Sequence, residues 1–552
     1  MPEKRKLKLK KFYFHPITVF LFGILIIMIL SLILSSFEMQ TTYSTANSTG
    51  TDLVSRLVVV ENLFSYDNLK YLISNTVKNF MGFSPLCMLL VSLIGISIAN
   101  ATGLIEVVAT KYIRKMSKNQ LTFLILFLGI ISSIVNEVGY AILIPLAAIL
   151  YEKEGRNPLL GIVTAFCGVA FGYGVTVFVG SQEVALIPYT TTAARLIDST
   201  AHISLTSNLF FIIAITIILP FIGTPIIEKL VSPRLPKYRR YDKVTGKTLQ
   251  TSELLLSDIE EEEQKKIAYE KNSKRGLKYA TVTAILVILL FAYMIIPDLP
   301  GSGLLLDMDE KIYLTQLFGD NSYFQDGFSF MVAILFILTG LAYGIGARSI
   351  KNDKELIEKT RDTFHDISMV ILLIFIFSQF LAFWKQSNIS IVILGWIANL
   401  LSNLQLDGII LIVITTLLVG LAGLFNTSMT TKWMILSPVI VPTFMQNNIS
   451  APYAQIVMRV GHSMTCGITP LMAFFAIYLG YLNIYNQNKE RPITIRQSLK
   501  FLMPYFSIML VVWILIIGLW YITGFGIGPH VRPTIWHLFG CFFLYKIILR
   551  YR

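Results

Sequence analysis

Charged residues are scarce in this chain. Lys, Arg, Asp and Glu together make up 14% of its 552 residues, whereas 54% are hydrophobic. So few charged side chains exclude a water-soluble fold with a polar shell, and most of the chain is expected to lie in lipid. Apolar runs of about 20 residues, the length that crosses roughly 30 Å of hydrocarbon as a helix, recur along the sequence. Examples are residues 18–37, 277–297, 328–348 and 501–524.

Several chemical signatures are also missing. The four cysteines form no CxxC pair and have no histidine at ligand spacing, so we interpret them as packing residues and expect no metal site. No GxxxxGK[ST] segment is present, which argues against ATP-driven transport, and neither GxSxG nor HExxH occurs. An intramembrane enzyme is therefore a remote alternative, and we expect no cofactor.

The positive charge lies between the apolar runs. A net charge of +13 would suggest nucleic-acid binding in a soluble protein, but here the Lys and Arg residues lie mostly in short connections. They read as determinants of topology, because basic loops stay on the cytoplasmic side. One arrangement satisfies nearly all of them. It places the basic N-terminal tail on the cytoplasmic side of a bacterial cytoplasmic (inner) membrane. The chain is therefore predicted to be a multi-pass protein with no nucleic-acid partner.

Four apolar blocks are interrupted by polar or flexible residues. Residues 121–151 and 406–445 are too long for one span and have polar centres, which predicts two re-entrant helical hairpins. Residues 158–194 and 453–485 are predicted to be broken spans. Backbone at membrane depth can leave the helix only where protein or a water-filled cavity satisfies its polar groups. The interruptions therefore predict a cavity inside the membrane.

The interruptions occur in the same order in both halves of the chain. With an odd number of crossings between the halves, the two copies are predicted to be inverted repeats, the arrangement of many secondary transporters. We predict an all-α polytopic membrane protein with about nine transmembrane helices plus two re-entrant hairpins. The expected organisation is a basic tail, first span and external segment (1–83); a first repeat (84–227); a charged cytoplasmic loop (228–276); two scaffold spans (277–348); a second repeat (364–485); a last scaffold span (501–524); and a C-terminal tail that fits either an extra span or a surface helix (530–552).

Five segments near these interruptions are the most specific parts of the sequence. They read SSIVNEVGYAILIPLAAIL (132–150), GTPIIEKLVSPRL (223–235), SQFLAFWKQSN (378–388), TTKWMILSPVIVPTFM (430–445) and RVGHSMTCGITPLM (459–472). Together they resemble the p-aminobenzoyl-glutamate transporter (AbgT) family, from about residue 79 to residue 528. The resemblance implies a homodimer and an elevator-like movement of a core against a scaffold. It also implies ion-driven uptake of p-aminobenzoyl-glutamate, export of sulfonamide-type antimetabolites, or both.

The chain departs from the family pattern at charged positions. Glu137 and Glu183 stand where the pattern has Asp, His462 stands where Asp follows the arginine, and Gly423 stands where Asn precedes the second hairpin tip. Glu137, Glu183 and His462 are the titratable candidates for ion coupling, because burial disfavours the charged form of each. Their alternative role is to hydrogen-bond the hairpin tips. The departures leave the coupling ion open between H⁺ and Na⁺.

Arg459 is the leading candidate for substrate binding. An unpaired cation inside an apolar span is expensive, so Arg459 needs an anion. Its guanidinium can clamp a substrate carboxylate in a bidentate manner, or it can pair internally with Glu137 or Glu183. The two readings are compatible if the substrate displaces the internal bridge.

Polar residues at the hairpin tips and in the second broken span complete the predicted site. The tip residues also cap helices, and their free N–H groups favour an anion. Trp433 is predicted to stack on an aromatic ring or to serve as a packing residue, while Lys432 reaches either substrate or water. The other substrate-binding candidates are Ser133, Asn136, Asn388, Asn426, Thr427, Ser428, Thr430, Ser463 and Thr465, and the helix-shaping candidates are Gly180, Pro438, Gly461 and Pro470.

The sequence leaves more than one transport function open. A small anionic, aromatic substrate is favoured because of Trp433, but dicarboxylate or citrate carriers also use hairpins and broken spans. A channel is less consistent, because opposed hairpin tips would obstruct a continuous pore.

Overall fold

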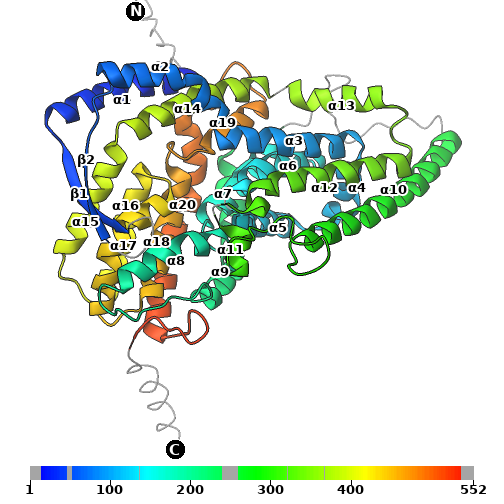
Figure 1. Cartoon of the computed structure of the whole chain (residues 1–552). Coiled ribbons are helices and arrows are strands. Elements are labelled where there is room, and N and C mark those ends of the chain that lie inside the picture. Colours follow the sequence, from blue (N-terminus) through cyan, green and yellow to red (C-terminus); the bar gives the residue numbers. More distant parts are fainter. Residues whose placement is uncertain are drawn as a thin grey trace, which may run out of the picture.

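A computed structural model shows a helical protein that carries one small β-hairpin (Figure 1). It describes residues 14–46, 53–135, 137–238, 259–319, 321–365 and 367–535. Within these residues, nine helices are long and apolar enough to cross a membrane. They are Pro16–Ser36, Tyr66–Ala101, Lys118–Val135, Leu209–Arg234, Glu270–Met294, Tyr323–Ala347, Ser368–Gln386, Gly408–Phe425 and Ile495–Thr523.

The polytopic helical class is thereby confirmed, although two of the nine helices differ from those predicted. The first arms of both predicted hairpins are long enough to be included. Both predicted broken spans are excluded, because their interruptions divide each of them into two short helices.

The first half of the chain contains one long helix, a short helix, a helix pair, an interrupted helix and a further long helix. These are α3 (Ser84–Ala101), α4 (Leu104–Lys111), α5 (Lys118–Ile131), α6 (Val138–Lys153), α7 (Pro158–Phe171), α8 (Ser181–Ala194) and α9 (Leu209–Ile226). A 3₁₀ turn at Ile113–Lys115 precedes α5, and another at Ser132–Val135 joins α5 to α6.

The second half repeats this order of elements. It contains α14 (Ser368–Gln386), α15 (Ile389–Asn403), α16 (Gly408–Phe425), α17 (Met429–Gln446), α18 (Ala451–Thr465), α19 (Phe475–Ile484) and α20 (Ile495–Thr523). A 3₁₀ turn, Cys466–Ile468, follows α18. The predicted helix pairs and broken helices therefore occur at corresponding places in both halves.

The two halves interlock through these matching elements. The second helix of the first pair, α6, packs on α7 and also on α19 of the other half. Correspondingly, α17 packs on α18 and also on α8 of the first half. Each helix pair thus contacts both interrupted helices, which draws all four interruptions toward one region.

The remaining elements surround this core. They are α1 (Pro16–Ser36), β1 (Gln40–Ala46), β2 (Leu53–Val59), α2 (Tyr66–Met81), α10 (Ile259–Met294), α11 (Tyr313–Phe318), α12 (Tyr323–Ala347) and α13 (Asp353–His365). α10 lies along α12, and α12 along α3, on the side of the molecule opposite the β-hairpin (Figure 1).

The β-hairpin is a feature that the helical prediction did not include. β1 and β2 pair antiparallel with Gln40 opposite Val59 and Ala46 opposite Leu53. The hairpin packs on α15 and α17, and the Trp396 Nε1 donates to the Gln40 carbonyl oxygen at 3.2 Å. The threonines of β1 and the valines of β2 favour extended backbone.

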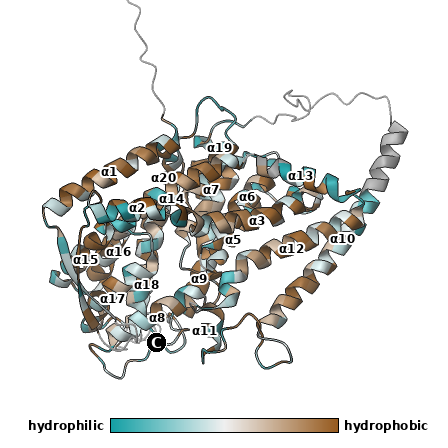
Figure 2. Cartoon of the chain, turned by 45° about the horizontal axis from the view of Figure 1, so that its top comes forward, coloured by the Kyte–Doolittle hydropathy of each residue, from teal (hydrophilic) through white to brown (hydrophobic). Residues whose placement is uncertain are grey.

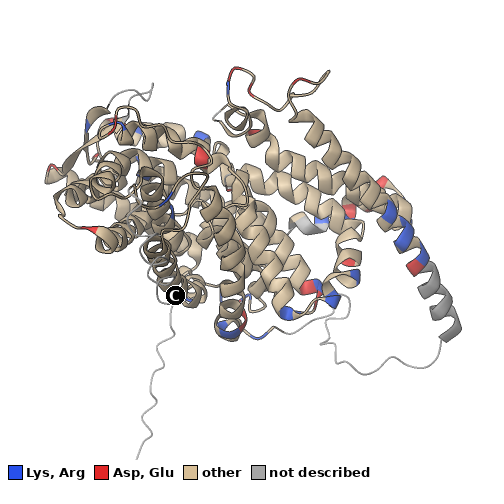
Figure 3. Ribbon diagram, turned by 90° about the horizontal axis from the view of Figure 1, so that it is seen from below, with Lys and Arg blue, Asp and Glu red and all other residues tan. Residues whose placement is uncertain are grey.

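The long helices expose apolar side chains as a membrane protein requires. Along α10, the side chains of Ile285, Leu286, Leu289 and Leu290 are all more than half exposed. Figure 2 shows that most long helices are hydrophobic along their length, with hydrophilic residues in the connections and α13. Charged residues gather mainly near the helix ends, whereas most of the helical ribbon is uncharged (Figure 3).

The region after α9 differs from its prediction as a solvated connector. The helix continues through a π turn (Ile227–Val231) and a 3₁₀ turn (Ser232–Arg234). The Glu228 carboxylate pairs there with the Arg156 guanidinium at 2.6 Å, and both side chains are largely buried. α10 begins at Ile259, inside the range predicted as loop. A loop was predicted here because the segment is charged, but some of these charged residues lie at the ends of helices.

Small residues let α3 and α12 approach closely, which gives a test of this packing. A Cβ on Gly95 would lie 2.7 Å from the Ala333 carbonyl oxygen, whereas a Cβ on Gly327 of the same partner helix would meet nothing within 4 Å. We expect Gly95→Ala to lower the free energy of unfolding by about 1–3 kcal/mol, because overpacking forces backbone shifts. Gly327→Ala should be neutral or stabilising by up to about 1 kcal/mol through helix propensity. Thermal unfolding in detergent checks both, and equal stability of the two variants would contradict the close approach.

Candidate functional site

The interruption between α7 and α8 lies at the centre of the predicted site. Residues 172–180 leave the helix, and Gly174 adopts a left-handed conformation with φ +83°. A Cβ on Gly174 would lie 2.8 Å from the Met429 Cε of α17, and a Cβ on Gly180 would lie 2.8 Å from the Ile134 carbonyl oxygen. Glycine is needed at both places because the two helix pairs approach this segment closely.

Arg459 of α18 forms a buried ion pair across this interruption. Its guanidinium bonds to the Glu183 carboxylate in the first turn of α8 and donates to the Gly174 carbonyl oxygen. The side chains of Arg459 and Glu183 are 3% and 1% exposed. The other Glu183 oxygen accepts a hydrogen bond from the Gly180 N–H at 2.9 Å. Of the two predicted internal partners, the structure pairs Arg459 with Glu183 and not with Glu137.

The Arg459 Nε atom is buried and has no hydrogen-bond partner among the described residues. A buried donor normally has a partner, so this group is free to bind an acceptor that enters the site. The guanidinium therefore binds an internal carboxylate and a backbone carbonyl and keeps one nitrogen atom, Nε, without a partner.

Lys432 and His462 form a second buried polar contact, between α17 and α18. The Lys432 Nζ atom bonds to the His462 Nδ1 atom, and both side chains are fully buried. The His462 Nε2 atom has no partner in the described part of the chain. A Cβ on Gly423 of α16 would lie 3.3 Å from the Lys432 Nζ atom, so the small residue at 423 leaves room for the lysine.

Tyr173 connects the polar groups of both halves, and sequence reasoning missed it. Its carbonyl oxygen accepts from the Ser463 hydroxyl, and its phenol accepts from the Gln182 Nε2 at 2.8 Å. Its ring lies 5.3 Å from the His462 ring, measured between centroids. Glu137, at the first hairpin tip, is near enough to interact electrostatically with Tyr173. The sequence signal that could have identified Tyr173 is its position between two glycines of the interruption, Gly172 and Gly174.

Trp433 is packed inside the protein in this conformation. It is fully buried, and its Nε1 donates to the Thr190 hydroxyl at 2.8 Å. Thr190 in turn lies 3.3 Å from the Gln455 Oε1 atom. Thr190 and Gln455 were not predicted, because nothing in their local sequence marks them as partners of a tryptophan.

The two hairpin tips differ in their exposure. Ser133 is fully buried in the 3₁₀ turn and bonds to the Ile130 carbonyl oxygen at 2.5 Å. Ser428 is exposed and caps α17 by accepting from the Thr431 N–H at 3.2 Å, and the Asn426 Oδ1 accepts from the Ser428 N–H at 3.0 Å. Neither serine lies in regular α-helix, and the predicted capping role is present at the second tip. Thr427 and Thr430 are half-buried beside it.

The other predicted residues fall into three groups. Thr465 and Gly461 lie where α18 meets α16, and a Cβ on Gly461 would lie 2.7 Å from the Thr416 carbonyl oxygen. Pro438 lies inside α17, and Pro470 follows the 3₁₀ turn after α18. Asn388 lies apart, since it caps α15 and its Nδ2 donates to the Val59 carbonyl oxygen of β2 at 3.4 Å. Asn136 lies outside the described residues.

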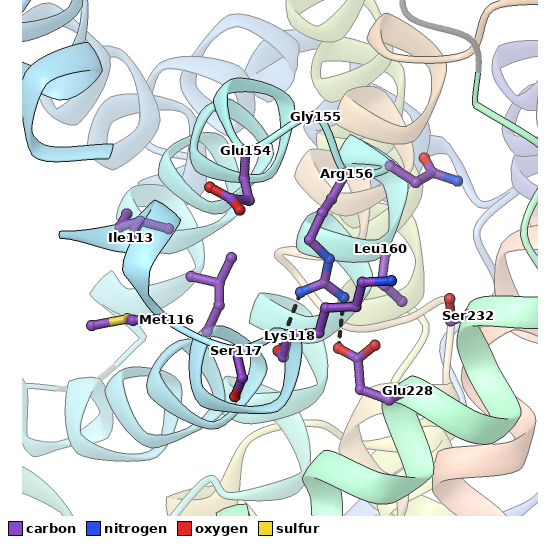
Figure 4. A pocket seen from close by; sticks show the side chains of 12 residues that line it. Ile113, Met116, Ser117, Lys118, Glu154, Gly155, Arg156, Leu160, Glu228 and Ser232 are labelled. Atoms are coloured by element: carbon purple, nitrogen blue, oxygen red, sulfur yellow. Dashed lines mark hydrogen bonds and ion pairs between the residues drawn. The ribbon is translucent and has the colours of Figure 1, made fainter. Parts of the chain in front are cut away.

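A cavity of about 380 Å³ lies elsewhere, at the start of α5, the end of α6 and the start of α7 (Figure 4). It is lined by Arg156 and Glu228, which form the ion pair drawn there, and by ten other residues. None of the predicted site residues lines it. We therefore take the cluster around Arg459, and not this cavity, as the candidate functional site.

The fold and the buried cluster together define a multi-pass membrane transport protein. The sequence identifies it further: residues 11–535 match the model of the AbgT putative transporter family. The match spans most of the chain, so the chain belongs to this family, and the resemblance of its motifs is confirmed.

Two kinds of relative accompany the family match. The p-aminobenzoyl-glutamate transport protein of Escherichia coli K12 is 28% identical over 522 residues, covering 94% of each chain. The solved structure of the YdaH transporter from Alcanivorax borkumensis is 28% identical, covers 93% of this chain and 100% of that one, and superposes with a TM-score of 0.46. MtrF from Neisseria gonorrhoeae, described among antimetabolite efflux pumps, is 28% identical with coverages of 94% and 98% and a TM-score of 0.45.

The buried pair gives a stability test. Arg459→Met leaves the Glu183 carboxylate buried without its partner, and we expect the free energy of unfolding to fall by about 3–5 kcal/mol. Arg459→Met/Glu183→Met should recover most of this loss, because two apolar side chains replace the pair. Thermal unfolding of the purified protein in detergent measures both.

The exposed pair between Lys153 and Glu106, at 3.1 Å, supplies the control. Lys153→Met should change stability by less than about 1 kcal/mol. If Arg459→Met behaves like Lys153→Met, the buried pair does not have the structural role described.

Proposed function

We propose that this chain is an ion-gradient-driven secondary transporter of p-aminobenzoyl-glutamate or similar aromatic acyl amino acids. The single observation that carries the proposal is Arg459, a guanidinium buried between two interrupted helices with one donor unpartnered. A guanidinium of this kind recognises a planar carboxylate. The E. coli relative, a p-aminobenzoyl-glutamate transport protein, supports this substrate class.

The contact between Arg459 and Glu183 suggests how recognition proceeds. The Glu183 carboxylate occupies the position that a substrate carboxylate would take on the guanidinium. An entering carboxylate either adds at the free Nε or displaces Glu183. Displacement leaves Glu183 buried without its partner, which is unfavourable unless a cation neutralises it. H⁺ or Na⁺ entering with the substrate would supply that charge, so the pair links ion and substrate binding.

The aromatic part of the substrate requires an apolar surface next to Arg459. Trp433 supplies one when α17 separates from α8 and its indole leaves Thr190. Tyr173 lies on the other side of the cluster and bonds to Ser463 of α18. These rings favour an aromatic solute over a dicarboxylate or citrate, which have no ring to stack.

The movement that exposes the site to each side is proposed to be elevator-like. In this proposal the helix pairs and interrupted helices form the moving core. The scaffold includes α12 and the two helices that pack on it, α3 and α10. The proposed homodimer forms through this scaffold. The protein would lie in a bacterial cytoplasmic membrane with its N-terminus inside. The same site serves uptake or export of sulfonamide-type antimetabolites, according to the gradients, and releases its substrate chemically unchanged.

Transport into proteoliposomes tests the substrate. We expect uptake of labelled p-aminobenzoyl-glutamate driven by an imposed pH or Na⁺ gradient, and competition by unlabelled substrate or sulfonamide but not by citrate. Uptake of citrate or succinate without p-aminobenzoyl-glutamate would contradict the proposal, and recovery of altered substrate would indicate an enzyme.

Substitution of Arg459 tests whether its buried guanidinium binds the substrate. Arg459→Ala should reduce binding of p-aminobenzoyl-glutamate by at least about 100-fold, because a bidentate charged contact is lost. Arg459→Lys keeps the charge and should retain partial binding. Arg195→Ala is the control, because Arg195 is exposed at the end of α8. Unchanged affinity in a folded Arg459→Ala protein would remove Arg459 from the site.

A further inference from the structure

The buried cluster holds more basic groups than acidic partners. Arg459 is matched by Glu183, but Lys432 has no carboxylate partner in the described part of the chain; its polar contact is His462. Lys432 is fully buried, so water does not stabilise an ammonium there. An unpaired buried ammonium is strongly unfavourable. The empty site therefore favours a neutral amine, whereas an anion beside it favours the ammonium.

Because Lys432 contacts His462, the pair has two accessible protonation states, which differ by one proton. A charged Lys432 donates to the neutral Nδ1 of His462, and a neutral Lys432 accepts from an Nδ1–H. An ammonium and an imidazolium in contact and both buried would repel each other. The pair thus alternates between neutral and singly positive, and histidine cannot neutralise the lysine as a carboxylate would.

No second counter-charge for the pair is found among the described residues around it. α16 has no ionisable residue, and α17 has none besides Lys432. The Cys466 thiol and the Tyr173 phenol face the pair. On α18 and α8, the Arg459–Glu183 pair is internally balanced, and Glu137, which interacts with Cys466, forms no ion pair with Lys432 among the described residues. No described carboxylate is therefore available to hold Lys432 charged.

The position of Lys432 in α17 points the same way. Ser428 caps this helix, and the Lys432 N–H bonds back to the Ser428 carbonyl oxygen at 3.3 Å, so the lysine lies in the first turns. The positive end of a helix disfavours a cation and favours an anion. Ser428 is exposed and Lys432 is buried one turn deeper, so the pair lies one turn below an exposed hairpin tip.

We propose that Lys432 and His462 form a proton-linked anion site. The pair is neutral in the empty transporter and takes up one proton when a substrate carboxylate binds beside it. The proton comes from water on the side of entry, forms an N–H bond on Lys432 Nζ, and leaves with the carboxylate on the other side. One proton therefore travels with each substrate anion. This inference rests on the proposed function and assigns its coupling ion to this pair.

Calorimetric titration of the purified full chain measures the proton directly. p-Aminobenzoyl-glutamate is titrated in buffers of different ionisation enthalpy at one pH, and the slope gives the protons taken up per substrate. We expect an uptake of about one in the wild type, since a single shared site changes by one proton. Lys432→Arg keeps a permanent charge and should bind with no uptake at Lys432.

Two further variants separate charge from structure. His462→Asp supplies a carboxylate that holds Lys432 charged, so proton uptake should fall toward zero and affinity should drop. Lys432→Met should weaken binding by about 10-fold or more and abolish uptake. Lys385→Met, on an exposed lysine of α14, should match the wild type in both.

The outcomes distinguish the two proposals. Wild-type binding with no proton uptake, or an unchanged uptake in Lys432→Arg, overturns the proton-linked site and leaves the proposed function standing. Failure of the wild type to bind p-aminobenzoyl-glutamate overturns the proposed function, and this inference with it. If Lys432→Arg fails to fold, His462→Asp decides: an uptake that stays at the wild-type value in that variant places the proton on another group, such as Glu183, and overturns the proton-linked site.

Discussion

The ion pair between Arg459 and Glu183 is the constraint on which the rest of the core depends. Two charges with almost no exposure are tolerated only when their attraction and further hydrogen bonds offset the loss of hydration. The break between α7 and α8 supplies those bonds, because its free backbone offers the Gly174 carbonyl to the guanidinium and the Gly180 N–H to the carboxylate. The interruption and the pair therefore require each other.

That mutual requirement also explains why the two halves interlock. Arg459 belongs to the second half and Glu183 to the first, so the pair forms only when α18 lies against the break in α7–α8. The packing of α17 on α8, and of α6 on α19, produces this placement from both sides. A movement that separates α17 from α8 would open the region around Trp433 while the central pair holds the halves in register.

Much of this arrangement could be predicted from the sequence, since polar breaks within apolar runs and a lone arginine are local signals. Electrostatic grounds alone predicted that Arg459 binds a substrate carboxylate or pairs with Glu137 or Glu183, and the structure was needed to choose Glu183. The contacts of Trp433 with Thr190, and of Asn388 with β2, could not be predicted, because they depend on which helices meet. The β-hairpin was also missed, since its Thr- and Ser-containing first strand resembles an external loop.

The charges of the core give Arg459 and Lys432 different roles, although the sequence alone suggests the same role, substrate binding, for both. Arg459 has a resident carboxylate, so it can remain charged when no substrate is present. Lys432 has only a histidine, so its charge depends on what enters. In such a site Arg459, which stays charged, can orient a carboxylate, and Lys432 can gain a proton when the carboxylate binds. Lys432 contacts His462 on α18, the helix that carries Arg459, so the two cations belong to one cluster.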